Sequence, residues 1–155
     1  MGRQVAGSNL YFTQRLQSEP GSAIDEMVAQ SAKRFLVPTG QPFFLSDKGE
    51  YEQELNAFFR DLTTDGCHSE FTWKAYARDI NSLLRFLHEV YRTHWLDATK
   101  QQLNHYRLVR RGPDAEQFGS KISGKSWNRA LGAIDRLYCY AVEEGWIDKP
   151  PFKYK

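Results

Sequence analysis

Residues 70–92 read EFTWKAYARDINSLLRFLHEVYR, and this stretch decides the fold. Its apolar side chains recur three or four residues apart, which is the period of one face of an α-helix. The pattern predicts a long helix over 70–92 with one face packed in a core. The residues expected on that face are Trp73, Tyr76, Ile80, Leu83, Leu84, Leu87 and Val90.

Two helices are predicted on the N-terminal side of this stretch. Ser22 is a favourable N-cap for a helix that runs to about Leu36, and the prolines of residues 37–42 end it because proline lacks the N–H that a helix needs. Asp47 and Glu50 are spaced as a capping pair for a helix over 47–62. Its expected inward face comprises Tyr51, Leu55, Phe58, Phe59 and Leu62.

Two more helices are predicted on the C-terminal side. A helix over 98–111 has Thr99 and Gln102 spaced as a capping box and Gly112 as its stop. Residues 112–122 lack a periodic apolar pattern and predict a loop, after which Ser123 caps a helix that ends at Gly145. The inward residues are Leu103, Tyr106 and either Leu108 or Val109 in the first helix, and Trp127, Leu131, Ile134, Tyr138, Ala141 and Val142 in the second.

Together these patterns predict an all-α fold, a compact bundle of four to five helices. No stretch of useful length shows the apolar–polar alternation of a half-buried strand. Residues 1–21 are interpreted as a flexible N-terminal tail, residues 22–149 as the helical domain, and residues 150–155 as the start of a linker. The 155 residues suffice for one domain that buries its core without metal or disulfide cross-links.

Composition excludes several classes of protein. No apolar run is long enough to span a membrane, and Cys67 and Cys139 form no disulfide framework, which predicts reduced thiols in a cytoplasmic protein. The four histidines are neither paired at helical spacing nor grouped with the cysteines, so we expect no metal site. The chain has no glycine-rich phosphate-binding loop, and we expect no cofactor.

Charge is distributed unevenly along the chain. Residues 1–66 contain 6 Lys or Arg and 9 Asp or Glu, a balance of −3, whereas residues 67–155 contain 15 and 10, a balance of +5. This asymmetry agrees with an anionic partner for the second half, but taken alone it favours an ordinary solvated surface. The placement of the charges on the helices therefore has to decide.

The basic residues of the helices predicted over 70–92 and 123–145 recur at helical spacing. The steps are 4, 7 and 7 in the first helix and 4 and 7 in the second, and each step returns to nearly the same angle around the helix. Each helix therefore carries one basic stripe opposite its apolar face. The stripes consist of Lys74, Arg78, Arg85 and Arg92, and of Lys125, Arg129 and Arg136.

Gly132 lies within the second stripe, although a glycine inside a helix costs about 1 kcal/mol relative to alanine. Either another backbone, such as a phosphodiester chain, approaches closely there, or two helices pack tightly. Ser123, Lys125 and Ser126 stand at the helix start, where N–H groups and the helix dipole favour phosphate. Two aligned basic stripes favour a DNA-binding surface, and the alternative is a helical protein–protein interaction domain that binds no nucleic acid.

Two stretches resemble the core-binding domain of tyrosine recombinases, the phage-type integrases. The first is TWKAYARDI at 72–80 with LLRFL at 83–87, and the second is SGKSWNRAL at 123–131 with IDRLY at 134–138. The ending AVEEGWI at 141–147 with PPF at 150–152 is similar to the exit of that domain toward the catalytic domain. The resemblance covers roughly residues 38–155 and is most like integrases of actinobacteria.

This resemblance implies a SAM-like helical domain that grips a recombination half-site as one half of a C-shaped clamp. It implies three partners: double-stranded DNA, a catalytic domain in cis and further protomers on the DNA. It also implies that the isolated fragment is a monomer. The residues expected at the DNA are Thr72, Lys74, Arg78, Arg85, Lys125, Ser126, Asn128, Arg129 and Arg136. Most would contact phosphates, whereas Asn128 and Arg129 are the candidates for base edges.

The catalytic residues of that family are an arginine, a His-x-x-Arg pair and a tyrosine near the chain end. None of the four histidines in this sequence is followed by an arginine three residues later, and Tyr154 is interpreted as a linker aromatic. We therefore expect that this chain does not itself cut or join DNA.

Overall fold

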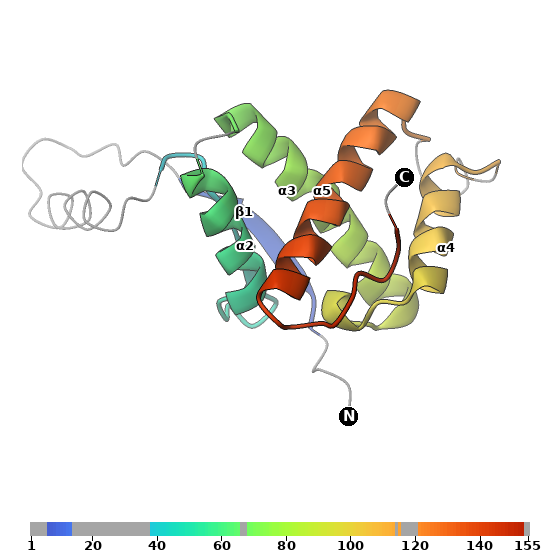
Figure 1. The fold of residues 1–155 in the computed structure, drawn as a ribbon, viewed down its shortest axis with the longest axis horizontal. Coiled ribbons are helices and arrows are strands. Elements are labelled where there is room, and N and C mark those ends of the chain that lie inside the picture. The colour runs from blue at the N-terminus through green and yellow to red at the C-terminus, as the bar shows by residue number, and fades with distance from the viewer. Residues whose placement is uncertain (1–5, 14–37, 66–67, 114, 116–120, 154–155) are drawn as a thin grey trace, which may run out of the picture.

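A computed structural model of the chain describes residues 6–13, 38–65, 68–113, 115 and 121–153 (Figure 1). The helix predicted over 22–36 and most of the loop predicted over 112–122 lie outside the described residues. The described α-helices are α2 (Gln53–Thr64), α3 (Glu70–Phe86), α4 (Lys100–Arg111) and α5 (Gly124–Glu143). None of the helices in these ranges is long and apolar enough to cross a lipid bilayer.

The helices α3 and α5 cross in the middle of the molecule, with α2 on one side and α4 on the other (Figure 1). Their apolar faces meet in a single buried cluster, as the apolar spacing predicts. Burial of this kind stabilises the fold by about 25 cal/mol for each Å² of apolar surface removed from water. The most deeply buried members are Phe44, Leu55, Phe59, Ile80, Leu83, Leu87, Ile134, Leu137 and Tyr138.

The helix predicted over 70–92 is present, but its last turn differs from the rest. Ser69 is the N-cap of α3, and beyond Phe86 the chain continues as a π-helix over Leu87–Tyr91 before Arg92 adopts a left-handed conformation with φ 52°. A π turn takes up one more residue than an α turn, so side chains shift around the axis. For that reason Val90, expected in the core, is exposed.

The prediction of an all-α fold is wrong in one respect: the fold is mainly α, but it also contains a small antiparallel sheet. Strand β1 (Ser8–Phe12) pairs with β2 (Pro42–Ser46), with Leu10 opposite Phe44. Residues 8–12, expected as part of a flexible tail, are therefore a strand. The sequence does not show the apolar–polar alternation of a strand here, because both faces of β2 carry aromatic rings. Phe44 is buried in the core, while Phe43 stacks on Tyr11 with ring centroids 5.4 Å apart.

The helix predicted to begin at Asp47 begins six residues later, at Gln53. Residues 47–50 instead form a turn after β2, in which the Ser46 hydroxyl accepts hydrogen bonds from the N–H groups of Lys48 and Glu50. Tyr51 precedes the helix and bridges to Leu45, so it is exposed rather than inward. The other expected inward residues of this helix, Leu55, Phe58, Phe59 and Leu62, are buried.

The capping box predicted for α4 is confirmed, because the side chains of Thr99 and Gln102 each bond the backbone N–H of the other residue. Val109 packs against the core and Leu108 is 60% exposed, which decides between the two inward candidates. A short 3-10 helix, Trp95–Asp97, connects the π-helix to α4.

Ser123 caps α5 as predicted. The helix ends at Glu143, two residues before the predicted end, and Gly145 follows in a left-handed conformation with φ 76°. Trp127, Ile134, Tyr138 and Ala141 are buried, and Leu131 and Val142 are partly exposed.

Candidate nucleic-acid interface

The basic stripe of α5 lies on the exposed face of that helix. Lys125, Arg129 and Arg136 are exposed, while Ile134 and Tyr138 on the opposite face are buried in the core. The spacing of 4 and 7 residues therefore predicts the correct face of the helix. This surface presents positive charge to the solvent beside the crossing with α3.

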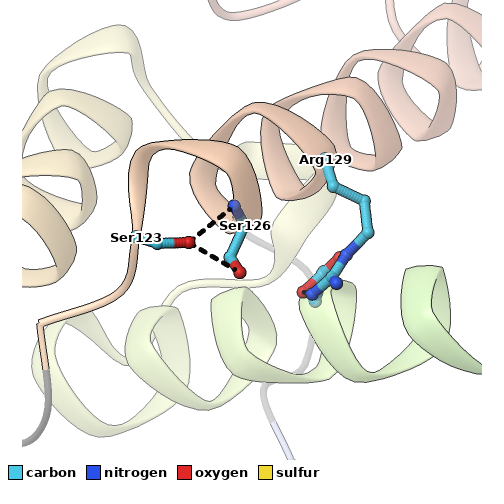
Figure 2. A network of polar contacts seen from close by, with 4 residues as sticks. Ser123, Ser126 and Arg129 are labelled. Carbon is cyan, nitrogen blue, oxygen red and sulfur yellow. Dashed lines mark hydrogen bonds and ion pairs between the residues drawn. The ribbon is translucent and has the colours of Figure 1, made fainter.

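Arg129 extends from α5 toward α3 (Figure 2), and it forms a two-bond ion pair with Asp79 of that helix. Its Nε donates to Asp79 Oδ2 at 2.8 Å and its Nη2 donates to Asp79 Oδ1 at 3.0 Å. Hydrogen bonding to this carboxylate raises the pKa of the Arg129 guanidinium above its ordinary value. The side chain that the sequence assigns to base edges is thus fixed in one direction by the neighbouring helix.

Arg136 is joined to the start of α3 in a similar way. Its Nη1 lies 2.6 Å from Nε2 of His68, which comes just before the α3 N-cap. Because an arginine only donates hydrogen bonds, Nε2 of His68 is the acceptor and the ring proton is on Nδ1. Two arginines of the α5 stripe therefore connect α5 to α3 and its N-terminal flank.

The first half of the α3 stripe, Lys74 and Arg78, borders β1. Lys74 pairs with Glu70 at 2.9 Å and lies 5.8 Å from the centroid of the Phe12 ring, and Arg78 lies 5.6 Å from the same centroid. Asp79, in contrast, contacts α5. Within the first turns of α3, Lys74 and Arg78 therefore lie toward β1, whereas Asp79 lies toward α5.

Two further basic residues of α3 and its extension have local partners. The Arg85 side chain lies 3.8 Å from Glu89, one turn further along, and both are well exposed. Arg92 Nη1 lies 3.4 Å from Nε2 of His88. Such exposed contacts are weak in water, so these side chains can be redirected toward an anion at little cost in free energy.

Two candidate residues, Thr72 and Ser126, lie in the first turns of α3 and α5 and bond the serines that cap these helices. The N–H of Thr72 donates to the Ser69 hydroxyl at 3.3 Å, and the N–H of Ser126 donates to the Ser123 hydroxyl at 3.1 Å (Figure 2). Phosphate contact through these two N–H groups would break the caps. Their side-chain hydroxyls, each within hydrogen-bond distance of the capping serine, are the groups that can also face DNA.

Lys125 and Asn128 are exposed on the first turns of α5. Among the residues that the structure describes, none forms a hydrogen bond or ion pair with either side chain. They are therefore the candidates whose donors are available without breaking a contact.

Gly132 lies on the same stripe, and the surrounding space decides between the two explanations for it. A Cβ at this position would have no neighbouring heavy atom within 4 Å among the described parts of the chain. Tight packing of two helices therefore does not explain the glycine. The glycine leaves the stripe without a side chain at this position, between Arg129 and Arg136.

Sequence reasoning missed a third basic stripe, on α4. This helix has four basic and no acidic residues, and its exposed side carries Lys100, Asn104, Arg107 and Arg111 in steps of 4, 3 and 4. The last of them donates from Nη1 to the carbonyl of Ile122 at 2.7 Å, which brings the end of this stripe close to the start of α5. The same spacing test applied to residues 98–111 finds it.

Sequence reasoning also missed Asp79 and His68, since spacing within one helix gives no sign of a partner on another helix.

Across the described ranges, no group of three or more His, Cys, Asp or Glu side chains could hold a metal ion.

Comparison with protein families decides the classification. The family described as the phage integrase N-terminal SAM-like domain matches residues 55–145, more than half of the 155-residue chain. The chain belongs to this family. The matched segment of this phage integrase domain contains nearly all of α2 and the whole of α3, α4 and α5, whereas β1 and β2 precede it. The resemblance inferred from the motifs in α3 and α5 is confirmed.

One curated protein illustrates the relation of this integrase domain to complete recombinases. The tyrosine recombinase XerC of Pseudomonas savastanoi pv. phaseolicola (strain 1448A / Race 6) is 29% identical over 100 residues, which cover 64% of the chain and 31% of XerC. The chain thus matches about a third of the length of that relative. No solved structure matches the chain.

Proposed function

We propose that this chain is the DNA-binding module of a site-specific tyrosine recombinase, and that it grips a recombination half-site through α3 and α5. The observation that carries the proposal is the basic stripe of α5, Lys125–Arg129–Arg136, exposed beside the crossing of the two helices. Family membership and the named activity of the XerC relative agree with this role.

The proposed contacts follow from the exposure and the hydrogen-bonding groups of each side chain. Lys125 and Arg78 are exposed, so they are proposed to meet phosphates. Arg85 and Arg136 extend these contacts along each stripe, while Lys74 lies at the β1 side. Asn128 and Arg129 are proposed to meet base edges, because amide and guanidinium groups match adenine and guanine through two bonds each.

Gly132 gives the proposed surface its shape. Without a side chain at this position, a phosphodiester backbone can approach the helix axis between two arginines. This is the remaining explanation of the two that the sequence left open.

The rest of the proposed protein follows from the same family. A catalytic domain in cis would supply the strand-transfer chemistry, and other protomers would join on the DNA. The segment leading to it would leave from the end of α5, where Phe152 still packs edge-on against Tyr138 with ring centroids 6.2 Å apart. Such a protein acts where the DNA lies, in agreement with the predicted cytoplasmic location.

The test compares charge removal at two sites. Lys125→Ala combined with Arg78→Ala should weaken binding to a mixed-sequence duplex by at least tenfold at low salt, because the variant neutralises fewer phosphates and so releases fewer counterions. Lys48→Ala, in the turn after β2, is the matched control and should bind as the unaltered chain does. Equal binding by the double variant and the unaltered chain would refute the proposed surface.

A further inference from the structure

Asp79 is an acidic residue of α3 that contacts the basic stripe of α5. Its carboxylate is only 12% exposed, whereas the Arg129 side chain that it binds is 44% exposed. The pair therefore has an inner acidic member and an outer basic member. An anion or a base edge that approaches this face reaches the arginine first.

The two bonds to Asp79 leave a defined set of donors on Arg129. A guanidinium has five N–H groups, and Asp79 accepts one from Nε and one from Nη2. Both N–H groups of Nη1 and the second one of Nη2 remain. One N–H on each of these nitrogens forms the end edge of the guanidinium, a two-donor fork that matches O6 and N7 of guanine.

Asp79 also cancels the charge that Arg129 would bring to DNA. Salt-dependent attraction to the phosphate backbone grows with the number of phosphates that free cations neutralise. A guanidinium already paired with a carboxylate adds little to that number. The pair contributes directed hydrogen bonds more than charge.

We propose that Asp79 is a specificity-determining residue for DNA binding. It holds Arg129 with its end edge toward a guanine, and it prevents Arg129 from acting as a general phosphate-binding cation. The inference rests on the proposed DNA-binding function and adds to it a positioning residue that has no contact with DNA.

Binding to DNA of no particular sequence gives the first test, using the 155-residue chain and a mixed-sequence duplex of about 30 base pairs. Asp79→Asn preserves the shape and removes the charge, so Arg129 becomes a free cation. We expect binding that is on the order of tenfold tighter at about 50 mM salt, with a salt slope steeper by about 0.9. Equal or weaker binding by Asp79→Asn would overturn the proposal, because a merely structural role for Asp79 predicts no gain.

Selection from a duplex library with randomised sequence gives the second test. The unaltered chain should enrich a guanine at one position, and Arg129→Ala and Asp79→Asn should both lose that preference. Retention of the guanine by Asp79→Asn, or its absence from the selection with the unaltered chain, overturns the inference. Melting temperatures of all variants establish that each is folded.

The two tests separate this inference from the proposed function. If Lys125→Ala weakens binding to the mixed-sequence duplex while Asp79→Asn changes nothing, the DNA-binding function stands and the role of Asp79 fails. If the unaltered chain binds no duplex even at low salt, both fail together.

Discussion

Asn56 on α2 forms both of its side-chain hydrogen bonds with the main chain of Phe44 on β2. The Phe44 N–H donates to Asn56 Oδ1 at 2.6 Å, and Asn56 Nδ2 donates to the Phe44 carbonyl at 2.9 Å. Both residues are fully buried. The amide therefore joins the sheet to the helices as a neighbouring strand would, where water cannot replace it.

Asn56→Ala should destabilise the fold strongly. The substitution leaves the buried Phe44 N–H without a partner, while the Phe44 carbonyl keeps only the hydrogen bond from the Glu52 N–H, at 3.2 Å. A buried group without a partner costs about 1–3 kcal/mol. We expect the free energy of unfolding in a denaturant titration to fall by about 1–3 kcal/mol. Asn104→Ala, on the exposed side of α4, is the control and should change it by no more than about 0.5 kcal/mol.

The same substitution, leucine to alanine, tests at Leu83 and at Leu108 which face of each helix is buried. Leu83→Ala removes a fully buried side chain from α3 and should cost about 2–5 kcal/mol in the free energy of unfolding. Leu108→Ala, where the side chain is 60% exposed, should cost less than about 0.5 kcal/mol. Similar losses in the two variants would show that α4 faces the core differently.

Gly132→Ala should separate stability from binding. Alanine favours the helix by about 1 kcal/mol over glycine, and no described neighbour obstructs the new Cβ, so the melting temperature should rise. The same methyl group stands where the phosphodiester backbone is proposed to approach, so the affinity for duplex DNA should fall. A variant that is both more stable and equally strong in binding would remove Gly132 from the interface.

Glu52 gives stability a dependence on pH. Burial raises its pKa above 4.5, although the hydrogen bond from the Ser8 hydroxyl, 2.9 Å long, opposes the shift. The folded state therefore binds the proton more tightly than the unfolded state. The charged carboxylate destabilises the fold above the raised pKa, and this cost disappears as the pH falls through the raised pKa toward 4.5.

Glu52→Gln should consequently raise the melting temperature at about pH 7, because glutamine is uncharged and its side-chain oxygen can still accept from Ser8. The advantage over the unaltered chain should vanish near pH 4, where Glu52 is protonated as well. Melting curves across this range test the sign, and Glu143→Gln, at the exposed end of α5, is the matched control. An advantage for Glu52→Gln that is independent of pH would contradict this assignment.

The helices α3, α4 and α5 were predictable because local patterns determine them. Apolar steps of three and four residues define their buried faces, and Thr99 and Ser123 mark two of their starts. The sheet was not predictable in this way. Phe43, Phe44 and Leu45 form an unbroken apolar run, and the strand that pairs with them is more than thirty residues away in the sequence.

The same distinction between local patterns and long-range contacts applies to the candidate site. The stripe of α5 follows from spacing within one helix, and the structure shows it exposed. The Asp79–Arg129 pair joins residues 50 positions apart, so it depends on how α3 crosses α5. For the same reason the position of the α3 stripe beside Phe12 could not be predicted, since it requires the sheet.

The salt dependence of DNA binding tests the central claim most directly. The 155-residue chain would be titrated onto a fluorescent mixed-sequence duplex at a series of salt concentrations, with anisotropy as the readout. The four exposed residues that are proposed to contact phosphates, Arg78, Arg85, Lys125 and Arg136, predict a logarithmic slope of about −3 to −4, from roughly 0.9 per phosphate. A slope near zero, or no binding even at the lowest salt, would contradict the account.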